Sequence, residues 1–294
     1  MQVIGIDWGS SNRRAYRVAR DGTLLEKRED GQGVLTAAQQ DFAASLHGWI
    51  GDWLAAGPAE VWLSGMIGSR SGWREAPYLP APAALDALAA AALPLGDGQR
   101  IVPGICQRPP QGPADVMRGE ETQLLGAWRQ ARRDGWYLLP GTHSKWVQLE
   151  GGRVLRFRSF MTGELYAQLR AHGALAACAQ GPDDHDAAFD AGLLQGMEEP
   201  ILSALFSIRA GLLLDVWPAA EGASRLSGLL IGAEWAAARR LGALGAGPLH
   251  LVGSPALAAR HRRAADALGI ETVVLDPDSC YRHALAALAH DHAR

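Results

Sequence analysis

The sequence predicts an α/β protein of two lobes, each built on a mixed sheet flanked by helices, with an active-site cleft between them. Three observations predict this class. The chain has 294 residues, which is more than one hydrophobic core usually takes. Short apolar strands alternate with helical patterns. Two hairpins with similar tips occur, one in each half of the chain, and both fit such a fold.

Composition excludes several classes of protein. Apolar residues make up 48% and charged residues 20%, as in a globular protein with a sizeable core. The net charge is −3, and no basic stripe indicates nucleic acid as a partner. The basic clusters at 129–133 and 260–263 are interpreted as solvated helix faces. Three widely separated cysteines predict no disulfide framework or zinc site.

No targeting or membrane segment is evident. No run approaches 18 apolar residues, and the N-terminus begins with a strand pattern instead of a signal peptide. We therefore expect a cytoplasmic protein with no membrane partner.

The first element is a strand that ends in a phosphate-sized turn. Apolar residues 3–6 stop at Asp7. The turn carries a glycine and three small hydrogen-bonding residues, Gly9, Ser10, Ser11 and Asn12. Residues 13–18 alternate in character and an Asp-Gly turn follows, so the strand is predicted to return as a hairpin.

Such a turn can bind phosphate without a Walker A loop, which the sequence lacks. Backbone N–H groups and the hydroxyls of Ser10 and Ser11 can bond phosphate oxygens, while Asp7 orients a hydrated Mg²⁺. The alternative is an ordinary N-terminal strand whose aspartate only starts a turn.

An amphipathic helix over residues 36–56 and a strand over 61–68 come next. The loop at 65–82 has no periodicity and is longer than a connection needs, which favours a binding loop. Trp73 and Tyr78 can stack on a small ligand, and Arg70 or Arg74 can pair with its acid group. The alternative is a surface loop held in place by its aromatic side chains.

An alanine-rich helix at 83–92, a strand at 100–104 and a linker at 109–113 complete the first lobe. The predicted lobes are therefore 1–113 and 114–278, with a final helix at 279–294 that packs back on the first.

A helix over 115–127 carries Glu120 and Glu121 near its start. Acidic residues are common there because they favour the positive end of the helix dipole. The preceding Arg-Gly pair indicates a close backbone approach, however, and a carboxylate fixed beside a cleft suits a general base for a hydroxyl nucleophile.

The second hairpin repeats the first. Strand 135–139 ends in a turn that continues into strand 146–149, and this turn contains Gly141, Thr142, His143, Ser144 and Lys145. Two such tips can face each other and bind a polyphosphate between them, with Lys145 neutralising charge. The alternative is that His143 is only a turn residue and Lys145 only a solvated charge.

Helices dominate the remainder. Thr162 is predicted to cap a helix, 171–179, 189–213 and 226–241 are predicted to be helical, and the acidic loop at 181–186 is interpreted as solvated. Gly228 and Gly232 allow close approach of another helix or of a flat ligand. Gly253 and Ser254 open a helix over 256–268 whose N-terminus suits a nucleotide phosphate or ribose.

The chain resembles the 2-dehydro-3-deoxygalactonokinase family, a branch of the actin-like sugar kinase superfamily. The matching runs stand in the family's order and span most of the chain. They are Ile6-Asp7-Trp8-Gly9-Ser10-Ser11-Asn12, Ser64-Gly65-Met66-Ile67-Gly68-Ser69, Met117-Arg118-Gly119-Glu120-Glu121-Thr122-Gln123, Pro140-Gly141-Thr142-His143-Ser144-Lys145-Trp146, Met161-Thr162-Gly163-Glu164-Leu165 and Ser227-Gly228-Leu229-Leu230-Ile231-Gly232-Ala233-Glu234.

The resemblance implies two ribonuclease-H-like lobes and a kinase that uses ATP and Mg²⁺ to phosphorylate the terminal hydroxyl of 2-dehydro-3-deoxy-D-galactonate. The hairpin tips match the superfamily's first and second phosphate motifs, and Gly253-Ser254 matches its adenosine motif. Asp7 is implied as the metal-orienting residue, and the base is Glu120, Glu121 or Asp7. The implied substrate residues are Ser64, Gly65, Met66, Trp73, Tyr78, Arg118 and Glu164.

Two other functions stay open at this point. One is a kinase for another small sugar acid or polyol, because loop 65–82 can change specificity without altering the ATP site. The other is a non-catalytic, nucleotide-switched regulator on the same fold. A homodimer is a possible assembly.

Overall fold

The computed structural model describes residues 2–37, 41–110, 112–245 and 247–292. The chain divides into two compact units. Unit 1 comprises Met1–Asp134, Val147–Phe157 and Leu275–Arg294, and unit 2 comprises Gly135–Trp146 and Arg158–Val274.

Unit 1 contains a six-stranded mixed sheet of order β3-β2-β1-β4-β8-β7. Its strands are β1 (Gln2–Trp8), β2 (Arg13–Val18), β3 (Leu24–Asp30), β4 (Ala59–Gly65), β7 (Leu93–Gly96) and β8 (Gln99–Ile101). β1 runs antiparallel to β2 and parallel to β4, with Asp7 opposite Arg14 on one side and Ser64 on the other. The predicted first hairpin is therefore present, and the register places Asp7 beside the end of β4.

A second sheet in unit 1 has the order β10-β9-β5. It contains β5 (Tyr78–Pro80), β9 (Gly104–Gln107) and β10 (Asp115–Met117). The predicted helix over 115–127 is wrong at its start, because residues 115–117 pair with β9 and the helix begins only at Glu120.

The alanine-rich segment at 83–92 is not one helix. Ala83–Ala84 forms β6 and pairs with β13 (Arg153–Phe160), so only α3 (Ala87–Ala90) is helical. Alanine's helix propensity of a few tenths of a kcal/mol per residue is weak and yields to strand pairing from elsewhere in the fold.

The predicted helix at 36–56 is also wrong in extent. Helices α1 (Val34–Ala37) and α2 (Phe42–Ala55) are separate, and residues 38–40 lie outside the described part of the chain. The Asp41 carboxylate accepts from the N–H groups of Ala43 and Ala44 and so starts α2 as an N-cap. Leu46, Ile50 and Trp53 of α2 are buried in the core.

The C-terminal helix α10 (Pro277–His292) packs in unit 1 against β1 and against α4 (Glu120–Ala131). A Cβ on Gly126 of α4 would lie 1.6 Å from the Cys280 carbonyl oxygen, and one on Gly5 would lie 2.4 Å from Leu285. Glycine at both positions lets α10 approach closely, which brings its first turns next to the end of β1.

Unit 2 contains β14 and β11 as neighbouring strands, with β15 largely in this unit beside β14, and β12 beginning in it beside β11. These are β11 (Gly135–Leu139), β12 (Ser144–Glu150), β14 (Leu249–Val252) and β15 (Thr272–Leu275). β14 is parallel to β11, with Tyr137 opposite His250. The predicted second hairpin is present, and Ser144 and Lys145 belong to its second strand.

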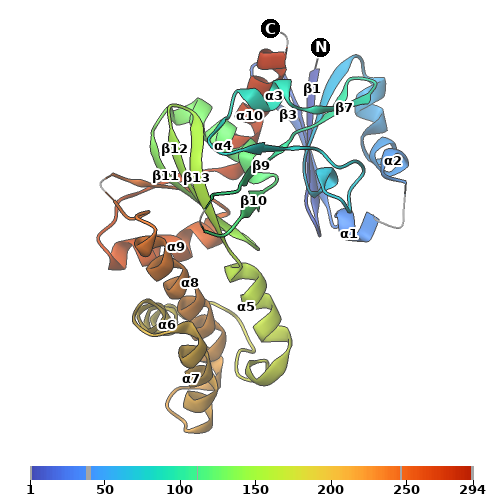
Figure 1. Cartoon of the computed structure of the whole chain (residues 1–294). Helices are drawn as coiled ribbons and strands as arrows, with labels where there is room; N and C mark the ends of the chain where they lie inside the picture. The colour runs from blue at the N-terminus through green and yellow to red at the C-terminus, as the bar shows by residue number, and fades with distance from the viewer. Residues whose placement is uncertain (1, 38–40, 111, 246, 293–294) are drawn as a thin grey trace. The chain divides into compact units, whose positions relative to one another are not determined.

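The helices of unit 2 are α5 (Thr162–Ala171), α6 (Asp186–Glu198), α7 (Ile201–Leu213), α8 (Gly222–Arg240) and α9 (Pro255–Ala267). Figure 1 shows α6 and α7 beside α8, the longest of them. The predicted helix at 189–213 is interrupted at Pro200, and the one at 171–179 is only a single 3₁₀ turn, Gly173–Leu175.

Glycines on both partners explain the close packing of α6 against α8. A Cβ on Gly228 or Gly232 would lie 2.0 or 2.2 Å from a carbonyl oxygen of α6, and Gly192 and Gly196 meet α8 in the same way. Helix packing, and not a flat ligand, therefore accounts for the glycine pair predicted on this helix.

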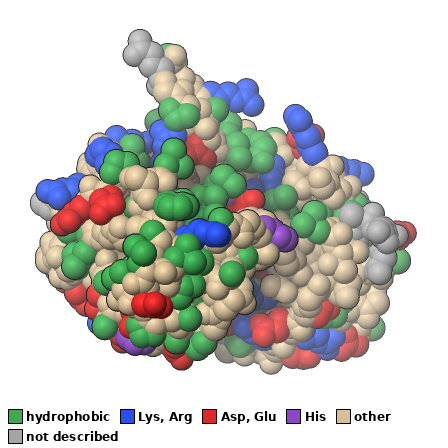
Figure 2. Space-filling model, turned by 90° about the horizontal axis from the view of Figure 1, so that it is seen from below, with side chains coloured by type: hydrophobic (Ala, Val, Ile, Leu, Met, Phe, Trp, Pro, Cys, Tyr) green, Lys and Arg blue, Asp and Glu red, His purple; other side chains and the backbone are tan. Residues whose placement is uncertain are grey.

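Charged side chains of both signs are interspersed on the face shown in Figure 2, with apolar side chains between them. Within the described ranges, no helix has the length and apolar character needed to cross a membrane.

Candidate active site

Asp7 stands at the end of β1 in a crowded acidic environment. Its Oδ2 lies 3.4 Å from Arg14 Nη1, and its side chain is 21% exposed. Burial raises the pKa of Asp7 to about 6, with Glu120 and Asp278 adding to the rise and Arg14 opposing it. The carboxylate is therefore short of compensating positive charge.

Glu120 and Glu121 start α4 but occupy different environments. Glu121 is fully buried and accepts from Gly119 N at 2.7 Å and from Thr122 Oγ1 at 3.1 Å. Burial, reinforced by Glu120, raises the pKa of Glu121 to about 8. Glu120 is half-buried and accepts from Arg118 N at 3.1 Å, so it is the more accessible of the two.

The predicted close backbone approach before these residues is present. Gly119 has a φ of +108°, and a Cβ there would lie 3.3 Å from Gly65 Cα. Gly65 itself has a φ of +85°, so both positions favour glycine. This contact brings the start of α4 to the end of β4.

Ser64 is buried at this point, and its Oγ lies 2.8 Å from Tyr281 Oη on α10. Burial, together with the charge of Asp7, raises the pKa of Tyr281 well above its usual value. Neither Tyr281 nor Asp278 was predicted, because only the packing of α10 brings them here. Met66 begins a 3₁₀ turn, Met66–Gly68, and packs against the core.

Arg118 rests on Tyr78. Its guanidinium lies 4.2 Å from the Tyr78 ring centroid, and its Nη2 donates to the Ala76 carbonyl at 2.8 Å. Its Nη1 is buried, and no hydrogen-bond partner is found for it among the described residues. Tyr78 thus supports an arginine whose second nitrogen is buried without a described partner.

The other aromatic of the 65–82 loop, Trp73, packs partly buried against the core, which agrees with the alternative of a loop held in place by its aromatic side chains. Arg70 is 88% exposed and pairs with Glu75. Arg74 donates to the Pro94 carbonyl at 3.4 Å.

The turn at residues 9–12 uses all of its carbonyl groups. They accept from Val34 N, Leu35 N, Gly33 N and Gly9 N at 2.9 to 3.1 Å. A Cβ on Gly33 would lie 2.2 Å from the Ser10 carbonyl oxygen, so only glycine allows this contact. Among the residues that the structure describes, the N–H groups of Ser10, Ser11 and Asn12 donate no hydrogen bond.

The turn at residues 140–143 is supported in a similar way by the first turn of α5. Glu164 N donates to the Thr142 carbonyl at 2.9 Å, and a Cβ on Gly163 would lie 2.4 Å from the Gly141 carbonyl oxygen. In the described part of the chain, the N–H groups of Gly141, Thr142 and His143 donate no hydrogen bond. His143 Nε2 lies 2.5 Å from Glu164 Oε2.

Lys145 is 5% exposed and lies within β12, so it is not a solvated surface charge. A cavity of about 180 Å³ opens beside this turn in unit 2. Its walls include Gly141 and Ser144 of the hairpin, Thr162 and Gly163 of α5, Leu230 and Ile231 of α8, and Ala256 and Leu257 of α9.

Gly253 and Ser254 lie at the start of α9, next to that cavity. Ser254 is the N-cap of α9 and its Oγ accepts from Leu257 N. A Cβ on Gly253 would lie 2.8 Å from Pro140 Cγ. This close contact joins the end of β14 to the turn at residues 140–143.

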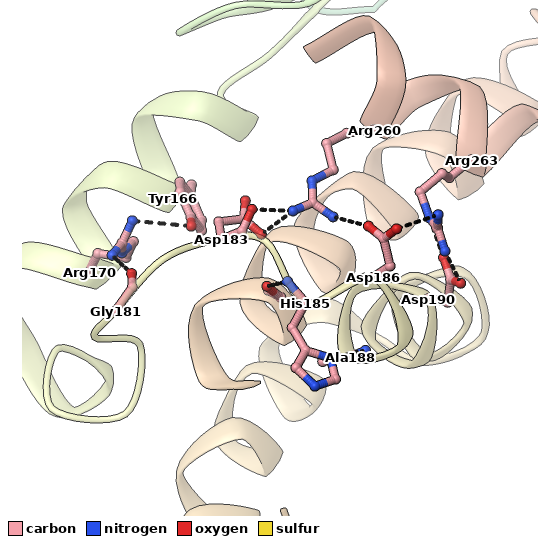
Figure 3. A network of polar contacts seen from close by, with 11 residues as sticks. Tyr166, Arg170, Gly181, Asp183, His185, Asp186, Ala188, Asp190, Arg260 and Arg263 are labelled. Carbon is pink, nitrogen blue, oxygen red and sulfur yellow. Dashed lines mark hydrogen bonds and ion pairs between the residues drawn. The ribbon is translucent and has the colours of Figure 1, made fainter. Parts of the chain in front are cut away.

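A chain of ion pairs borders the cavity (Figure 3). Arg260, which is 13% exposed, pairs with Asp183 and Asp186. Arg263 continues the chain to Asp186 and Asp190. Residues 184–186 and Arg262 are exposed, as predicted for solvated segments. Arg260 is not, and its pairing across unit 2 is not visible in the local sequence.

His185 caps α6, its Nδ1 accepting from Ala188 N. Nowhere in the described residues does a group of three or more His, Cys, Asp or Glu side chains form a metal site.

Thr162 is not the N-cap of α5, because Met161 holds that position. The Thr162 hydroxyl instead donates to Glu234 Oε2, while Trp146 Nε1 donates to Glu234 Oε1 at 2.8 Å. Glu234 is 3% exposed, and burial raises its pKa to about 7. The sequence did contain a signal for this role of Glu234: it is the single carboxylate in the apolar run at 229–235, and buried charges are normally paired.

Comparison with known proteins adds an independent line of evidence. The family model described as 2-keto-3-deoxy-galactonokinase matches residues 7–288. The probable 2-dehydro-3-deoxygalactonokinase of Rhizobium meliloti (strain 1021) is 39% identical, over 97% of this chain and 95% of its own. The 2-dehydro-3-deoxygalactonokinase of Escherichia coli (strain K12) is 38% identical, over 98% of both chains.

Solved structures agree. A crystal structure of a Sinorhizobium meliloti protein assigned as a 2-dehydro-3-deoxygalactonokinase superposes with a TM-score of 0.90 at 37% identity, covering 98% of each chain. The activator of 2-hydroxyisocaproyl-CoA dehydratase from Clostridium difficile has a TM-score of 0.54 at 14% identity, covering 100% of this chain and 96% of its own, and shares the fold alone. The predicted α/β class with mixed sheets is confirmed, and the chain belongs to the 2-keto-3-deoxy-galactonokinase family, whose members are phosphotransferases.

Proposed function

We propose that this kinase transfers the γ-phosphoryl group of ATP to the terminal 6-hydroxyl of 2-dehydro-3-deoxy-D-galactonate, in galactonate catabolism. The observation that carries the proposal is the pair of turns, at 9–12 and 140–143, in which backbone N–H groups are unused. Carbonyls of both turns bond to a supporting segment. Converging free N–H groups are a means by which proteins bind phosphate oxygens.

In this proposal unit 2 holds the nucleotide. The turn at 140–143 binds phosphate oxygens through its N–H groups, assisted by the positive end of α5. The adjoining cavity, with Leu230 and Ile231 on one wall and the start of α9 on another, takes the nucleoside. Gly253 and Ser254 set the position of that helix end.

Asp7 fits a role in holding Mg²⁺. Its pKa of about 6 reflects burial and neighbouring carboxylates, so a cation there would relieve electrostatic repulsion. Magnesium ions typically take one or two carboxylates and keep water and phosphate oxygens as their other ligands, which agrees with the absence of a larger acidic cluster among the described residues. When bound, Mg²⁺ would neutralise charge on the phosphates.

Glu120 is our candidate for the general base, since it is half-buried and electrostatically close to Asp7. It would accept the proton of the sugar hydroxyl as that oxygen attacks phosphorus. Glu121, fully buried and bonded to Gly119 N, would hold the start of α4 in place.

Arg118 is the candidate for binding the substrate carboxylate. Its position over the Tyr78 ring and its bond to Ala76 leave Nη1 without a described partner. A guanidinium fixed in this way can donate to a carboxylate at small entropic cost. Ser64, Gly65, Met66, Trp73 and Glu164 remain proposed substrate residues.

The test is a panel of 2-keto-3-deoxy sugar acids incubated with ATP, with coupled detection of ADP. The proposal expects rapid ADP release with 2-dehydro-3-deoxy-D-galactonate and a phosphorylated product. Preference for another acid or polyol would support the alternative kinase. ADP release at only a basal ATPase rate with every acid would contradict the proposal and favour a nucleotide-switched regulator.

We further propose a cytoplasmic location and a homodimer. The three cysteines are buried and free, as expected in a reducing compartment. Cell fractionation and light scattering of the purified protein test these two points.

A further inference from the structure

Glu234 of α8 is hydrogen-bonded to Thr162, which lines the candidate nucleotide cavity, and has no role in the function proposed above. Its side chain is 3% exposed. It accepts from Trp146 Nε1 at 2.8 Å and from the Thr162 hydroxyl, and the Ser144 side chain is a further donor. A buried carboxylate is costly unless donors of this kind satisfy it.

The donors come from two separate pieces of the cavity wall. Ser144 and Trp146 belong to β12, directly after the turn at residues 140–143, while Thr162 is the first residue of α5. Ser144 and Thr162 also line the cavity itself. One carboxylate therefore joins the strand that leaves the turn to the helix end that supports it.

The chemistry of the donors determines the orientation of each group. Trp146 Nε1 can only donate, so one oxygen of Glu234 accepts from it, and the Thr162 hydroxyl donates to the other oxygen. Because its hydrogen is used in this way, the Thr162 hydroxyl does not donate to a ligand, whereas the N–H groups of residues 141–143 are unused among the described residues.

We propose that Glu234 is a positioning residue for the nucleotide. It holds β12 and the first turn of α5 together, and so keeps the N–H groups of residues 141–143 directed at the phosphates. This inference rests on the proposed nucleotide site in unit 2.

The test uses two variants of the full chain, Glu234→Gln and Thr162→Val, with ATP and the sugar acid varied separately. The amide of Glu234→Gln keeps the size of the side chain but can accept through one oxygen only. Thr162→Val removes one donor without changing Glu234. We expect both variants to raise KM for ATP about ten-fold or more, with a much smaller change in KM for the sugar acid.

Glu221→Gln is the matched control. Glu221 precedes α8, is 16% exposed and pairs with Arg225, but it does not line the cavity. Its KM for ATP should stay at the wild-type value. Thermal unfolding of the wild type and the three variants shows whether each is folded. If Glu234→Gln does not fold, the KM for ATP of Thr162→Val tests the inference.

An unchanged KM for ATP in a folded Glu234→Gln or Thr162→Val protein would overturn the inference. So would equal losses for both substrates that follow the loss of melting temperature, because that pattern indicates a structural role only. If the wild-type protein neither binds ATP in calorimetry nor releases ADP, the proposed function fails instead, so the two failures can be told apart.

Discussion

The two phosphate-sized turns share their backbone design but differ in where the nearest carboxylates lie. In each turn, a carbonyl contacts a glycine that precedes or begins a helix, Gly33 in unit 1 and Gly163 in unit 2. In unit 1, Asp7 is partly exposed directly before the turn. In unit 2, Glu234 is buried and bonded to the strand and helix on either side of the turn. The same turn can therefore serve a metal-linked phosphate in one unit and a nucleotide in the other.

In the proposed function, this difference separates the chemical step in unit 1 from nucleotide binding in unit 2. Carboxylates with raised pKa values, Asp7 and Glu121, cluster with Glu120 in unit 1. The cavity of unit 2 has apolar side chains on two walls, the Arg260 ion pairs at its border and the Thr162 hydroxyl bonded to buried Glu234. Substitutions in unit 1 should lower kcat, and substitutions at the turn of unit 2 should raise KM for ATP.

The largest effect is expected for Asp7→Asn, which keeps the shape of the side chain but removes its charge. We expect kcat to fall about 1,000-fold, because several kcal/mol of charge stabilisation are lost. A coupled ADP assay measures this. Asp52→Asn, at an exposed carboxylate of α2 that pairs with Arg28, is the control. Wild-type turnover in Asp7→Asn would contradict the metal role of Asp7.

The next largest effect is expected in kcat when the neighbouring carboxylates Glu120 and Glu121 are replaced one at a time. Glu120→Gln should lower kcat about 100-fold, the usual loss for a general base, with little change in KM for ATP. Glu121→Gln should reduce kcat far less, because its carboxylate bonds to Gly119 N and Thr122. The same kinetic assay compares the two, and a larger loss in Glu121→Gln would reverse the assignment.

Gly33→Ala and Gly163→Ala test the backbone design shared by both turns. Each new methyl would meet a carbonyl oxygen at 2.2 or 2.4 Å, so the turn must shift. We expect Gly33→Ala to lower kcat and Gly163→Ala to raise KM for ATP, each about ten-fold, since misplacement of this size weakens positioning. Gly48→Ala, with nothing within 4 Å of the new methyl, and Gly245→Ala, whose nearest atom lies 4.0 Å away, should behave as wild type. Equal effects in all four variants would argue against the turns.

The smallest effect concerns pH. Asp7, with a pKa of about 6, is ionised above that pH, so kcat/KM should fall as pH decreases through about 6. Arg14 opposes the rise in the Asp7 pKa, and Arg14→Gln should therefore move this acid limb to higher pH. A pH–rate profile measures the shift, with Arg17→Gln of the same strand as control. If the acid limb of the Arg14→Gln profile stays at the wild-type pH, a group other than Asp7 is responsible for it.

Local patterns in the sequence predicted both turns, because an apolar run, a glycine and hydroxyl residues are contiguous there. They did not reveal Gly33, Gly163 or Tyr281, which reach the turns and Ser64 only through tertiary packing. Glu234 lies in one of the matching runs, but the local sequence predicts no role for it, since its donors Thr162 and Trp146 lie 72 and 88 residues away.

The errors in the predicted helices also arise from contacts that local sequence does not show. The alanine-rich segment 83–92 was predicted to be a helix because helix propensity depends only on local sequence. Ala83 and Ala84 instead pair with β13, which is distant in sequence. The predicted helix over 36–56 joined two separate helices, because the apolar periodicity does not show that Asp41 caps the start of the second one. The pairing of the acidic loop with Arg260 was not predicted because the two are distant in sequence.

Calorimetric titration of a non-hydrolysable ATP analogue into Glu120→Gln and Gly163→Ala tests most directly whether chemistry and nucleotide binding are divided between the units. The account predicts wild-type affinity in Glu120→Gln despite its loss of turnover, and affinity at least about ten-fold weaker in Gly163→Ala. Weakened binding in Glu120→Gln together with wild-type binding in Gly163→Ala would contradict it.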